Sequence, residues 1–251
     1  ILFCFSFSNS YLIVYPTSLL LLGGVDKMAR GQLILIEGLD RSGKSTQASI
    51  LSTKLSPSKL IKFPDRSTPI GKLINEYLTN KSFTLSDQAA HLLFLANRWE
   101  LSQQIQDLLN QGYFIILDRY IYSGIAYTLA KNDFHDETIS QGKNKQQLNN
   151  IDWLLSPDKG LPKPDLTLFL TLDLEEISKR KGWGDERYEL QQFQAKVKQC
   201  FLEILDTNKD PTIRIVDVGG KTIDQVTTQL WEIIETNKNH ELINDSIQFI
   251  T

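Results

Sequence analysis

The chain has 251 residues, which fits one large domain or two small ones, and its 41% apolar and 23% charged residues are ordinary for a globular protein. Its net charge of −3 at pH 7 gives no sign of a nucleic-acid-binding surface, so we expect no nucleic-acid partner. The two cysteines, Cys4 and Cys200, are too few for a disulfide framework and form no CxxC metal pattern, which suits a reducing compartment.

The first residues form an uncharged, strongly apolar stretch at 1–22. This stretch is long enough to span a bilayer, but it lacks the basic start of a signal peptide and the Arg-rich pattern of a mitochondrial presequence. The only methionine is Met28. We therefore predict that Met28 is the natural start and that residues 1–27 are an apolar leader from upstream translation; a real anchor or leader is the alternative.

Short apolar runs recur along the rest of the chain, at 33–37, 60–63, 113–118, 166–172 and 212–218. They are unbroken rather than alternating, as is typical of strands buried on both faces. Helical patterns lie between them, so the order predicts an α/β fold in three αβα layers, with a five-stranded parallel sheet.

Local signals mark where several helices begin and end. A helix is predicted to start after the glycines at 38–43, and Thr68 with Pro69 is a good N-cap and first-turn pair. Ser86 should open a long helix that Gly112 closes. The last helix is predicted at 222–236, with one apolar stripe formed by Ile223, Val226, Leu230, Ile233 and Ile234.

Two segments depart from this alternation of strands and helices. Residues 136–150 are polar and rich in Gln and Asn, which predicts a solvent loop or a poorly ordered insertion. Residues 238–251 are predicted to be a loosely held C-terminal tail.

Residues 38–46 read GLDRSGKST and fit the pattern GxxxxGK[ST], with a predicted strand before and a helix after. Glycines let backbone N–H groups turn toward phosphate oxygens, and the helix N-terminus adds partial positive charge. The alternative, a chance glycine turn, does not explain these flanking elements. The pattern predicts a nucleoside triphosphate site made by Arg41, Ser42, Gly43, Lys44, Ser45 and Thr46.

Asp40 and Arg41 stand inside this anion-binding loop. An acid that pointed inward would repel a triphosphate, so Asp40 is predicted to point away, toward a neutral hydroxyl of a second substrate. Arg41 can neutralise charge on the transferring phosphoryl group, as an arginine finger supplied by the same chain.

Asp118 and Arg119 end the third predicted strand. The Asp118 carboxylate and the Ser45 hydroxyl are candidate ligands for Mg²⁺. The alternative for Asp118 is an N-cap of a helix at 121–130. If Asp118 acts on Mg²⁺, the neighbouring Arg119 would face a phosphate.

An acceptor pocket is indicated by residues from two further elements. Arg66 follows the second strand, and Phe94 and Arg98 stand four apart on the long helix, on one face. An aromatic ring beside a guanidinium could hold a base, although Phe94 alone would more often be a core residue. With Asp40 and three arginines, the set predicts a nucleoside monophosphate site.

Several motifs resemble those of eukaryotic thymidylate kinase over residues 31–236, within a predicted domain at 28–237. Besides the glycine loop, they are FPDRSTPIGKLINEYL, HLLFLANRWE, DRYIYSGIAY, GLPKPDLTLFL and ERYE, in this order. The resemblance implies the P-loop nucleoside monophosphate kinase fold with a lid at 181–189. It also implies ATP-dependent phosphorylation of dTMP to dTDP with Mg²⁺, and a homodimer packed through long helices such as 86–111.

The resemblance also implies roles for individual residues. Asp40 binds the sugar 3′-hydroxyl, and Arg66 and Arg119 hold the acceptor phosphate. Phe94 stacks on thymine and Arg98 hydrogen-bonds its edge. Arg180 would lie against adenine. The remaining implied acceptor residues are Phe63, Leu78, Ser123, Gly124, Tyr127 and Tyr188. The implied catalytic set is Arg41, Lys44, Asp118 and Arg119.

Three other readings stay open. A regulatory GTPase would need DxxG and NKxD motifs, but DVGG at 217–220 and TNKD at 207–210 are poorly placed. A deoxynucleoside kinase would not need two arginines at the acceptor 5′ position. A membrane-anchored form of the same enzyme has only the leader in its favour, and we expect a cytoplasmic or nuclear protein.

The 136–150 insertion could gate the pocket or be inert.

Overall fold

The computed structural model describes residues 29–132, 134, 148–179, 187–238 and 246–251. The predicted leader at 1–27, most of the 136–150 insertion, Arg180 and most of the predicted lid lie outside these residues. No helix within the described ranges is long and apolar enough to cross a membrane.

The centre of the fold is a parallel sheet of five strands in the order β2-β3-β1-β4-β5. The strands are β1 (Leu33–Gly38), β2 (Ser58–Lys62), β3 (Phe114–Asp118), β4 (Leu166–Thr171) and β5 (Ile213–Asp217). All five predicted strands are therefore present, with bounds shifted by at most two residues. Every residue of β1 is buried, because helices cover both faces of the central strand.

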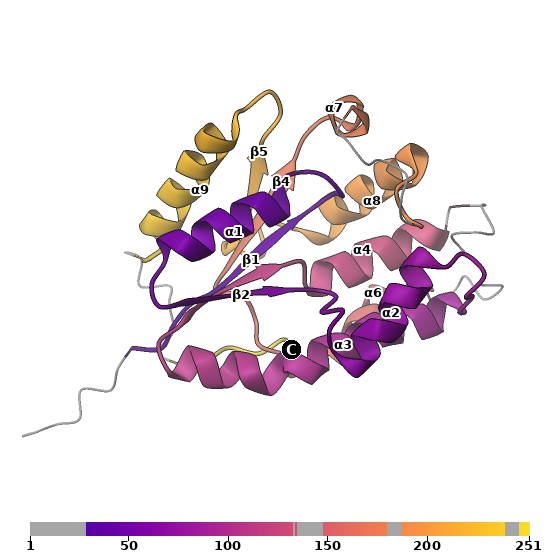
Figure 1. Cartoon of the computed structure of the whole chain (residues 1–251), viewed down its shortest axis with the longest axis horizontal. Coiled ribbons are helices and arrows are strands. Elements are labelled where there is room, and N and C mark those ends of the chain that lie inside the picture. The colour runs from indigo at the N-terminus through magenta and orange to yellow at the C-terminus, as the bar shows by residue number, and fades with distance from the viewer. Residues whose placement is uncertain (1–28, 133, 135–147, 180–186, 239–245) are drawn as a thin grey trace, which may run out of the picture.

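One face of the sheet is covered by α1 (Lys44–Lys54) and α9 (Ile223–Lys238). Figure 1 shows these two helices side by side, with α1 against β1, β2 and β3 and α9 against β4. Ile34 and Ile36 of β1 belong to the same buried cluster as Leu51 of α1 and Leu230 of α9.

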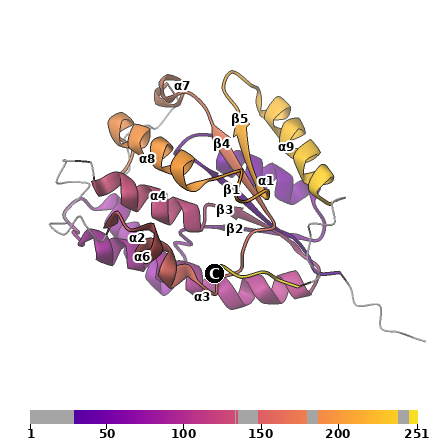
Figure 2. The same cartoon turned by 180° about the vertical axis from the view of Figure 1, so that it is seen from behind.

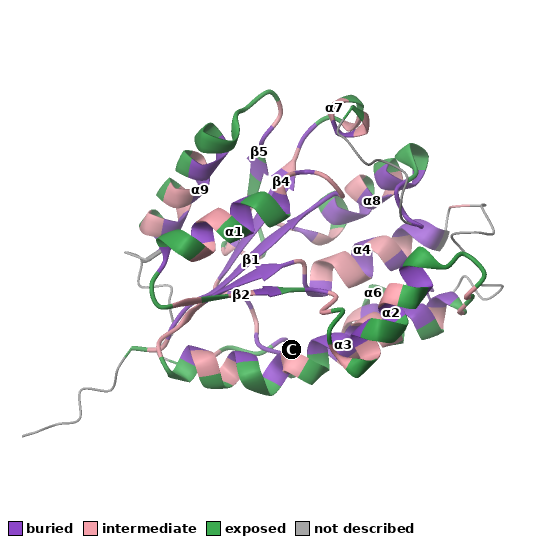
Figure 3. Cartoon of the chain, in the orientation of Figure 1, coloured by how far each residue is buried: buried purple, intermediate pink, exposed green. Residues whose placement is uncertain are grey.

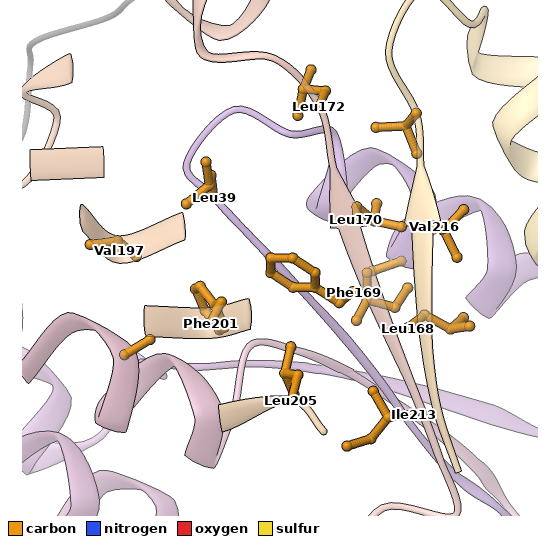
Figure 4. Close-up of a cluster of buried hydrophobic side chains, with 14 of the residues drawn as sticks. Leu39, Leu168, Phe169, Leu170, Leu172, Val197, Phe201, Leu205, Ile213 and Val216 are labelled. Atoms are coloured by element: carbon orange, nitrogen blue, oxygen red, sulfur yellow. The ribbon is translucent and has the colours of Figure 1, made fainter. Parts of the chain in front are cut away.

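The other face is covered by α3 (Asp87–Asn110), α4 (Ile121–Asn132) and α8 (Gln191–Ile204), with α2 (Pro69–Thr79) packed on α3. Figure 2 shows this layer from behind. Leu33 and Leu35 of β1 cluster with Ile105 of α3. Phe169 of β4 packs against Phe201 of α8, with ring centres 4.9 Å apart. Figure 4 shows these two side chains within the buried cluster. Three short helices, α6 (Ile151–Leu155), the 3₁₀ helix η1 (Ser156–Asp158) and α7 (Leu174–Ser178), complete the described elements.

The predicted helix signals are present. The Thr68 hydroxyl accepts a hydrogen bond from Gly71 N at 2.9 Å, and the Ser86 hydroxyl accepts one from Ala89 N at 3.2 Å. Gly112 follows α3 with φ of 84°, the left-handed conformation that favours glycine at a helix end.

Two expectations about the C-terminal part were wrong. Ile223 was predicted to belong to the apolar stripe of the last helix, which should face the core, but it is 57% exposed, because it is the first residue of α9. The end of the predicted loose tail is bound to the fold instead. Ile250 is buried, and its backbone N–H donates to Leu161 O at 2.9 Å while its carbonyl accepts from Gly160 N at 2.9 Å.

The carboxyl ends of the parallel strands meet at one edge of the sheet, where ligands bind in such folds. Figure 3 shows the buried central strands β1, β3 and β4 between helices whose outer surfaces are exposed. The glycine loop after β1 and Asp118 at the end of β3 both lie at this edge. DVGG begins with the last residue of β5 and continues into a turn, with Gly219 N donating to the Asp217 carboxylate at 3.0 Å.

Candidate active site

The loop between β1 and α1 requires glycine at two positions. Gly38 has φ of 148°, and a Cβ there would lie 2.6 Å from Leu170 O and 2.8 Å from Ser42 Oγ. Gly43 has φ of 97° immediately before α1. The predicted triphosphate residues in this loop and the first turn of α1 are therefore brought together as expected: Arg41, Ser42, Gly43, Lys44, Ser45 and Thr46.

Lys44 is buried beneath this loop, and its Nζ donates to Leu39 O. Burial, together with the nearby Arg119, lowers the pKa of Lys44 to about 8, although the carboxylates of Asp40 and Asp118 oppose the shift. Phosphate oxygens beside Nζ would stabilise the charged form, so anion binding and protonation of Lys44 are coupled.

Ser45 and Asp118 meet across the loop, with Ser45 Oγ donating to Asp118 Oδ2 at 2.5 Å. This places a hydroxyl and a carboxylate oxygen side by side at the start of α1. In the described part of the chain, no group of three or more His, Cys, Asp or Glu could hold a metal ion alone. A site with one carboxylate, one hydroxyl and remaining positions for water and phosphate oxygens fits Mg²⁺, so the residues present fit the implied metal.

Arg41 is in the left-handed region, with φ of 62°, which is unusual for a side chain larger than glycine and is found mainly at functional sites. Its Nη2 lies 3.0 Å from Glu189 Oε1, and its Nε donates to the same oxygen at 3.1 Å. Arg41 lines the cavity, as predicted, but its guanidinium pairs with the last residue of the predicted lid. Sequence reasoning did not foresee this partner.

Asp40 is the centre of a small polar cluster at the edge of the sheet. It forms an ion pair with Arg119, and its Oδ2 accepts hydrogen bonds from Tyr127 OH at 2.9 Å and Gln194 Nε2 at 2.8 Å. Burial alone would raise the pKa of Asp40, but Arg119, Lys44 and these hydrogen bonds outweigh it and hold that pKa below its ordinary value. Asp40 is thus an anion at neutral pH, aimed away from the loop interior.

Arg119 shares the strained backbone of Arg41, with φ of 71°. Its Nη1 donates to Gly38 O and to Ser123 Oγ, both at 3.1 Å. The sequence treated Asp40 and Arg119 as separate contacts to a sugar and to a phosphate, whereas the structure joins them. Their pairing fixes both groups before any ligand arrives.

Glu37, the fifth residue of β1, was missed. It is fully buried, and its carboxylate accepts from Tyr120 N at 2.9 Å, from Ser123 N at 3.0 Å and from Ser123 Oγ at 2.6 Å. Burial raises the pKa of Glu37, against the opposing effects of Arg119 and Ser123. Glu37 orders the first turn of α4, and an acid at the end of an otherwise apolar strand was the signal for it.

A cavity of about 320 Å³ opens beside the glycine loop. All the predicted acceptor residues line it: Asp40, Phe63, Arg66, Leu78, Phe94, Arg98, Arg119, Ser123, Gly124, Tyr127 and Tyr188. These residues come from three helices (α2, α3 and α4), from the segments that follow three strands and from the segment before α8, far apart in the sequence. Their convergence on one cavity is the main structural support for the predicted acceptor set.

Two residues of the cavity wall, Arg66 and Phe94, differ in burial. Arg66 is exposed, and its Nη1 donates to Asn75 Oδ1 of α2 at 3.0 Å. Phe94 is half-buried and meets Tyr77 edge to face, with ring centres 6.5 Å apart. Phe94 therefore packs on the core and also presents a surface to the cavity, so both readings of this residue hold in part.

Lys131 is a second missed residue of the cavity wall. Its buried Nζ lies 3.4 Å from Asp87 Oδ1 and 5.1 Å from the ring centre of Tyr188. Burial would lower the pKa of Lys131, but Tyr188, Tyr77 and Asp87 outweigh it and raise that pKa. The spacing of four residues from Tyr127 on α4 could have identified it.

The end of the predicted lid is anchored to α2, although Arg180 and residues 181–186 lie outside the described ranges. Arg187 Nε donates to Tyr77 O at 3.0 Å, and the hydroxyls of Tyr77 and Tyr188 are 2.8 Å apart. Of the 136–150 insertion, Leu148 is buried and Asn150 caps α6 by accepting from Trp153 N. The predicted gate falls on residues that the structure does not describe.

Comparison with known proteins gives consistent similarities. A family model described as Thymidylate kinase matches residues 36–230. A thymidylate kinase of Dictyostelium discoideum is 42% identical over 213 residues, covering 82% of this chain and 86% of that protein. Thymidylate kinases of Homo sapiens and Schizosaccharomyces pombe are 38% and 39% identical, covering 88% of this chain in both cases and 90% and 99% of those proteins.

Proposed function

The chain belongs to the thymidylate kinase family, and from this premise we propose that it transfers the γ-phosphoryl group of ATP to dTMP, giving dTDP and ADP. The observation that carries the proposal is the convergence of the predicted acceptor residues on one cavity beside the glycine loop. Donor and acceptor phosphates would meet where Lys44, Arg41 and Arg119 line that cavity.

On the donor side, the backbone N–H groups of residues 38–45 and the N-terminus of α1 bind the ATP phosphates. Lys44 adds a positive charge at the outer phosphates. Ser45 and Asp118 would hold Mg²⁺, which neutralises charge on the phosphates when it is bound. Arg180 stays a proposed contact to adenine.

On the acceptor side, Phe94 stacks on the base and Arg98 hydrogen-bonds its edge. Tyr127 lies against the sugar, with its hydroxyl held by Asp40 at 2.9 Å. The Asp40 carboxylate receives the sugar 3′-hydroxyl, and Arg66 and Arg119 hold the phosphate. Phe63, Leu78 and the Ser123–Gly124 pair close the remaining walls, and Tyr188 covers the sugar side.

Catalysis on this arrangement is mainly positioning and charge neutralisation, because phosphoryl transfer needs little covalent participation from the protein. Arg41 must exchange Glu189 for the transferring group. Lid closure over ATP would exclude water, since an open site would hydrolyse ATP without an acceptor.

Assembly and location are further parts of the proposal. We propose a homodimer through α2 and α3, where Leu73, Leu92 and Trp99 are 47%, 42% and 41% exposed. Light scattering of the purified chain tests this. We propose a cytoplasmic or nuclear location, since the two cysteines of the sequence are too few for a disulfide framework, which suits a reducing compartment.

The test of the proposed reaction is a coupled assay of ADP release with ATP, Mg²⁺ and a panel of acceptors: dTMP, dUMP, dCMP, dGMP and thymidine. We expect dTMP to be the best acceptor and thymidine to be inactive, because thymidine has no phosphate for Arg66 and Arg119. Turnover of thymidine without turnover of dTMP would establish a deoxynucleoside kinase instead.

A further inference from the structure

Arg98 is held in one orientation by a residue that the sequence did not single out. Its Nε donates to Asp158 Oδ1 and its Nη2 donates to Asp158 Oδ2, both at 2.8 Å. The Arg98 side chain is 3% exposed and that of Asp158 is fully buried. Two parallel charge-assisted bonds fix the plane of a guanidinium as well as its position.

The third nitrogen of this guanidinium, Nη1, makes no hydrogen bond to Asp158. Within the described residues, Arg98 Nη1 has no hydrogen-bond partner, and Arg98 lines the cavity. We propose that Asp158, the last residue of η1, is a positioning residue for base recognition, which holds Arg98 so that its remaining donors face the acceptor base. This inference rests on the proposed function and deepens it.

Gly124 of α4 bounds the guanidinium from another side. A Cβ at Gly124 would lie 2.9 Å from Arg98 Nη1 and 3.2 Å from Nη2. The absence of a side chain there gives Arg98 the room to lie against the helix. Asp158 and Gly124 together define the plane, one by bonding and the other by leaving space.

A second donor lies in the same part of the cavity. The Tyr120 hydroxyl is buried and has no hydrogen-bond partner among the described residues, and Tyr120 lines the cavity. Burial raises the pKa of Tyr120, and the charges that act on it are those of Arg98 and Asp158. A buried hydroxyl without a partner is costly, which points to a polar ligand group at this place.

The chemistry of these groups selects one class of base. A guanidinium can only donate hydrogen bonds, so it pairs with a carbonyl oxygen on the base edge and not with an amino group at the same position. Sites built around such a hydrogen bond discriminate strongly, because the wrong partner leaves a buried donor unpaired. The fixed Arg98 therefore favours thymine or uracil over cytosine.

The chain contains a matched control for Asp158. Asp165 forms a similar buried pair with Arg30, at 2.8 Å and 2.6 Å, and it also accepts from Leu33 N at 2.8 Å. Arg30 and Asp165 precede β1 and β4, at the amino ends of the strands, and neither lines the cavity. An equivalent substitution there removes a similar ion pair without touching the site.

The experiment measures the dissociation constants of dTMP and dCMP by titration calorimetry for the wild-type, D158N and D165N chains, with thermal unfolding in parallel. We expect D158N to weaken dTMP binding by about 10- to 100-fold, which is the effect of a misplaced charged hydrogen bond. The selectivity ratio, defined as the dissociation constant of dCMP divided by that of dTMP, should fall by a similar factor. D165N should lose stability and keep the wild-type ratio. A folded D158N chain with the wild-type ratio overturns the inference.

A second variant, G124A, keeps the test decisive if D158N does not fold. Alanine favours the helix more than glycine does, so the stability of α4 should not fall, while the added methyl group displaces Arg98. We expect the dissociation constant of dCMP divided by that of dTMP to fall about tenfold or more. An unchanged ratio overturns the inference. No dTMP binding by the wild-type chain would instead reject the proposed function, and the inference with it.

Discussion

Two buried arginine–aspartate pairs occupy opposite ends of this fold, and only one of them lines the cavity. At the amino ends of the strands, Arg30 Nη1 donates to Gly31 O at 2.9 Å as well as to Asp165, so this guanidinium binds the backbone of the protein. Beside the cavity, Asp158 accepts hydrogen bonds from Nε and Nη2 of Arg98, and Nη1 makes no bond to Asp158. The same pair of residue types therefore stabilises the fold in one place and prepares a binding site in the other.

The largest effect we expect from this contrast is on stability at the amino-end pair. D165A leaves the Arg30 charge buried without its partner, which typically costs about 3–5 kcal/mol in the free energy of unfolding. Urea denaturation measures this loss, and kcat and KM for dTMP, measured on the folded protein, should stay at wild-type values. A variant with normal stability but impaired turnover would mean that the amino-end pair serves the site after all.

For Arg41 we expect a large loss of turnover and a small loss of stability. R41A removes the half-buried end of an ion pair with Glu189, so we expect a smaller loss of stability than in D165A, whose pair is more deeply buried. We expect kcat to fall by about 10²-fold or more, with a smaller change in dTMP affinity, because the charge matters in the transition state. Steady-state kinetics with calorimetric dTMP binding measures both. Intact turnover with collapsed binding would remove Arg41 from its catalytic role.

The C-terminal residues 246–251 lie between the two ion pairs in the structure, because they bind the segment that links Asp158 to Asp165. Their removal exposes the pocket of Ile250 and breaks its hydrogen bonds with residues 160 and 161. We expect the free energy of unfolding to fall by about 2 kcal/mol, with dTMP affinity unchanged. Denaturant unfolding of the truncated chain checks this, and an unaltered midpoint would show that the tail contributes nothing.

A smaller effect should appear in the pH dependence of ATP binding. Lys44 has its pKa lowered to about 8 by burial, and bound phosphate stabilises its charged form. ATP affinity should therefore be constant below pH 8 and fall with rising pH above it, by up to about tenfold per unit, since binding then requires uptake of a proton. Calorimetry at several pH values measures this. K44R, which stays charged, should show weaker binding without this slope, and the same slope in K44R would assign it to another group.

The sequence predicted the sheet because its strands are unbroken apolar runs, and it predicted helix starts such as Thr68 because capping depends on local residue types. It left out α8, although Phe193, Val197 and Phe201 recur there at helical spacing; the structure packs Phe193 against Tyr127 of α4 and Phe201 against Phe169 of β4. It also treated the tail as loose, since the contact of Ile250 with Leu161 joins residues far apart in the sequence.

For the site, motifs predicted which residues face the cavity but not how those residues bind one another. The pairing of Asp40 with Arg119 depends on the order of β1 and β3 in the sheet and on the strained backbone of Arg119. Asp158 carries no local signal, because its role comes from a partner sixty residues earlier. Supporting residues of this kind become visible only when the fold brings their partners together.

The most direct test of the account is a crystal structure of the chain with dTMP bound. We predict that the thymine ring stacks on Phe94 with a carbonyl oxygen at Arg98 Nη1, the 3′-hydroxyl at Asp40 and the phosphate between Arg66 and Arg119. A nucleotide bound outside this cavity, or bound in reverse with its phosphate at Arg98, would contradict the account.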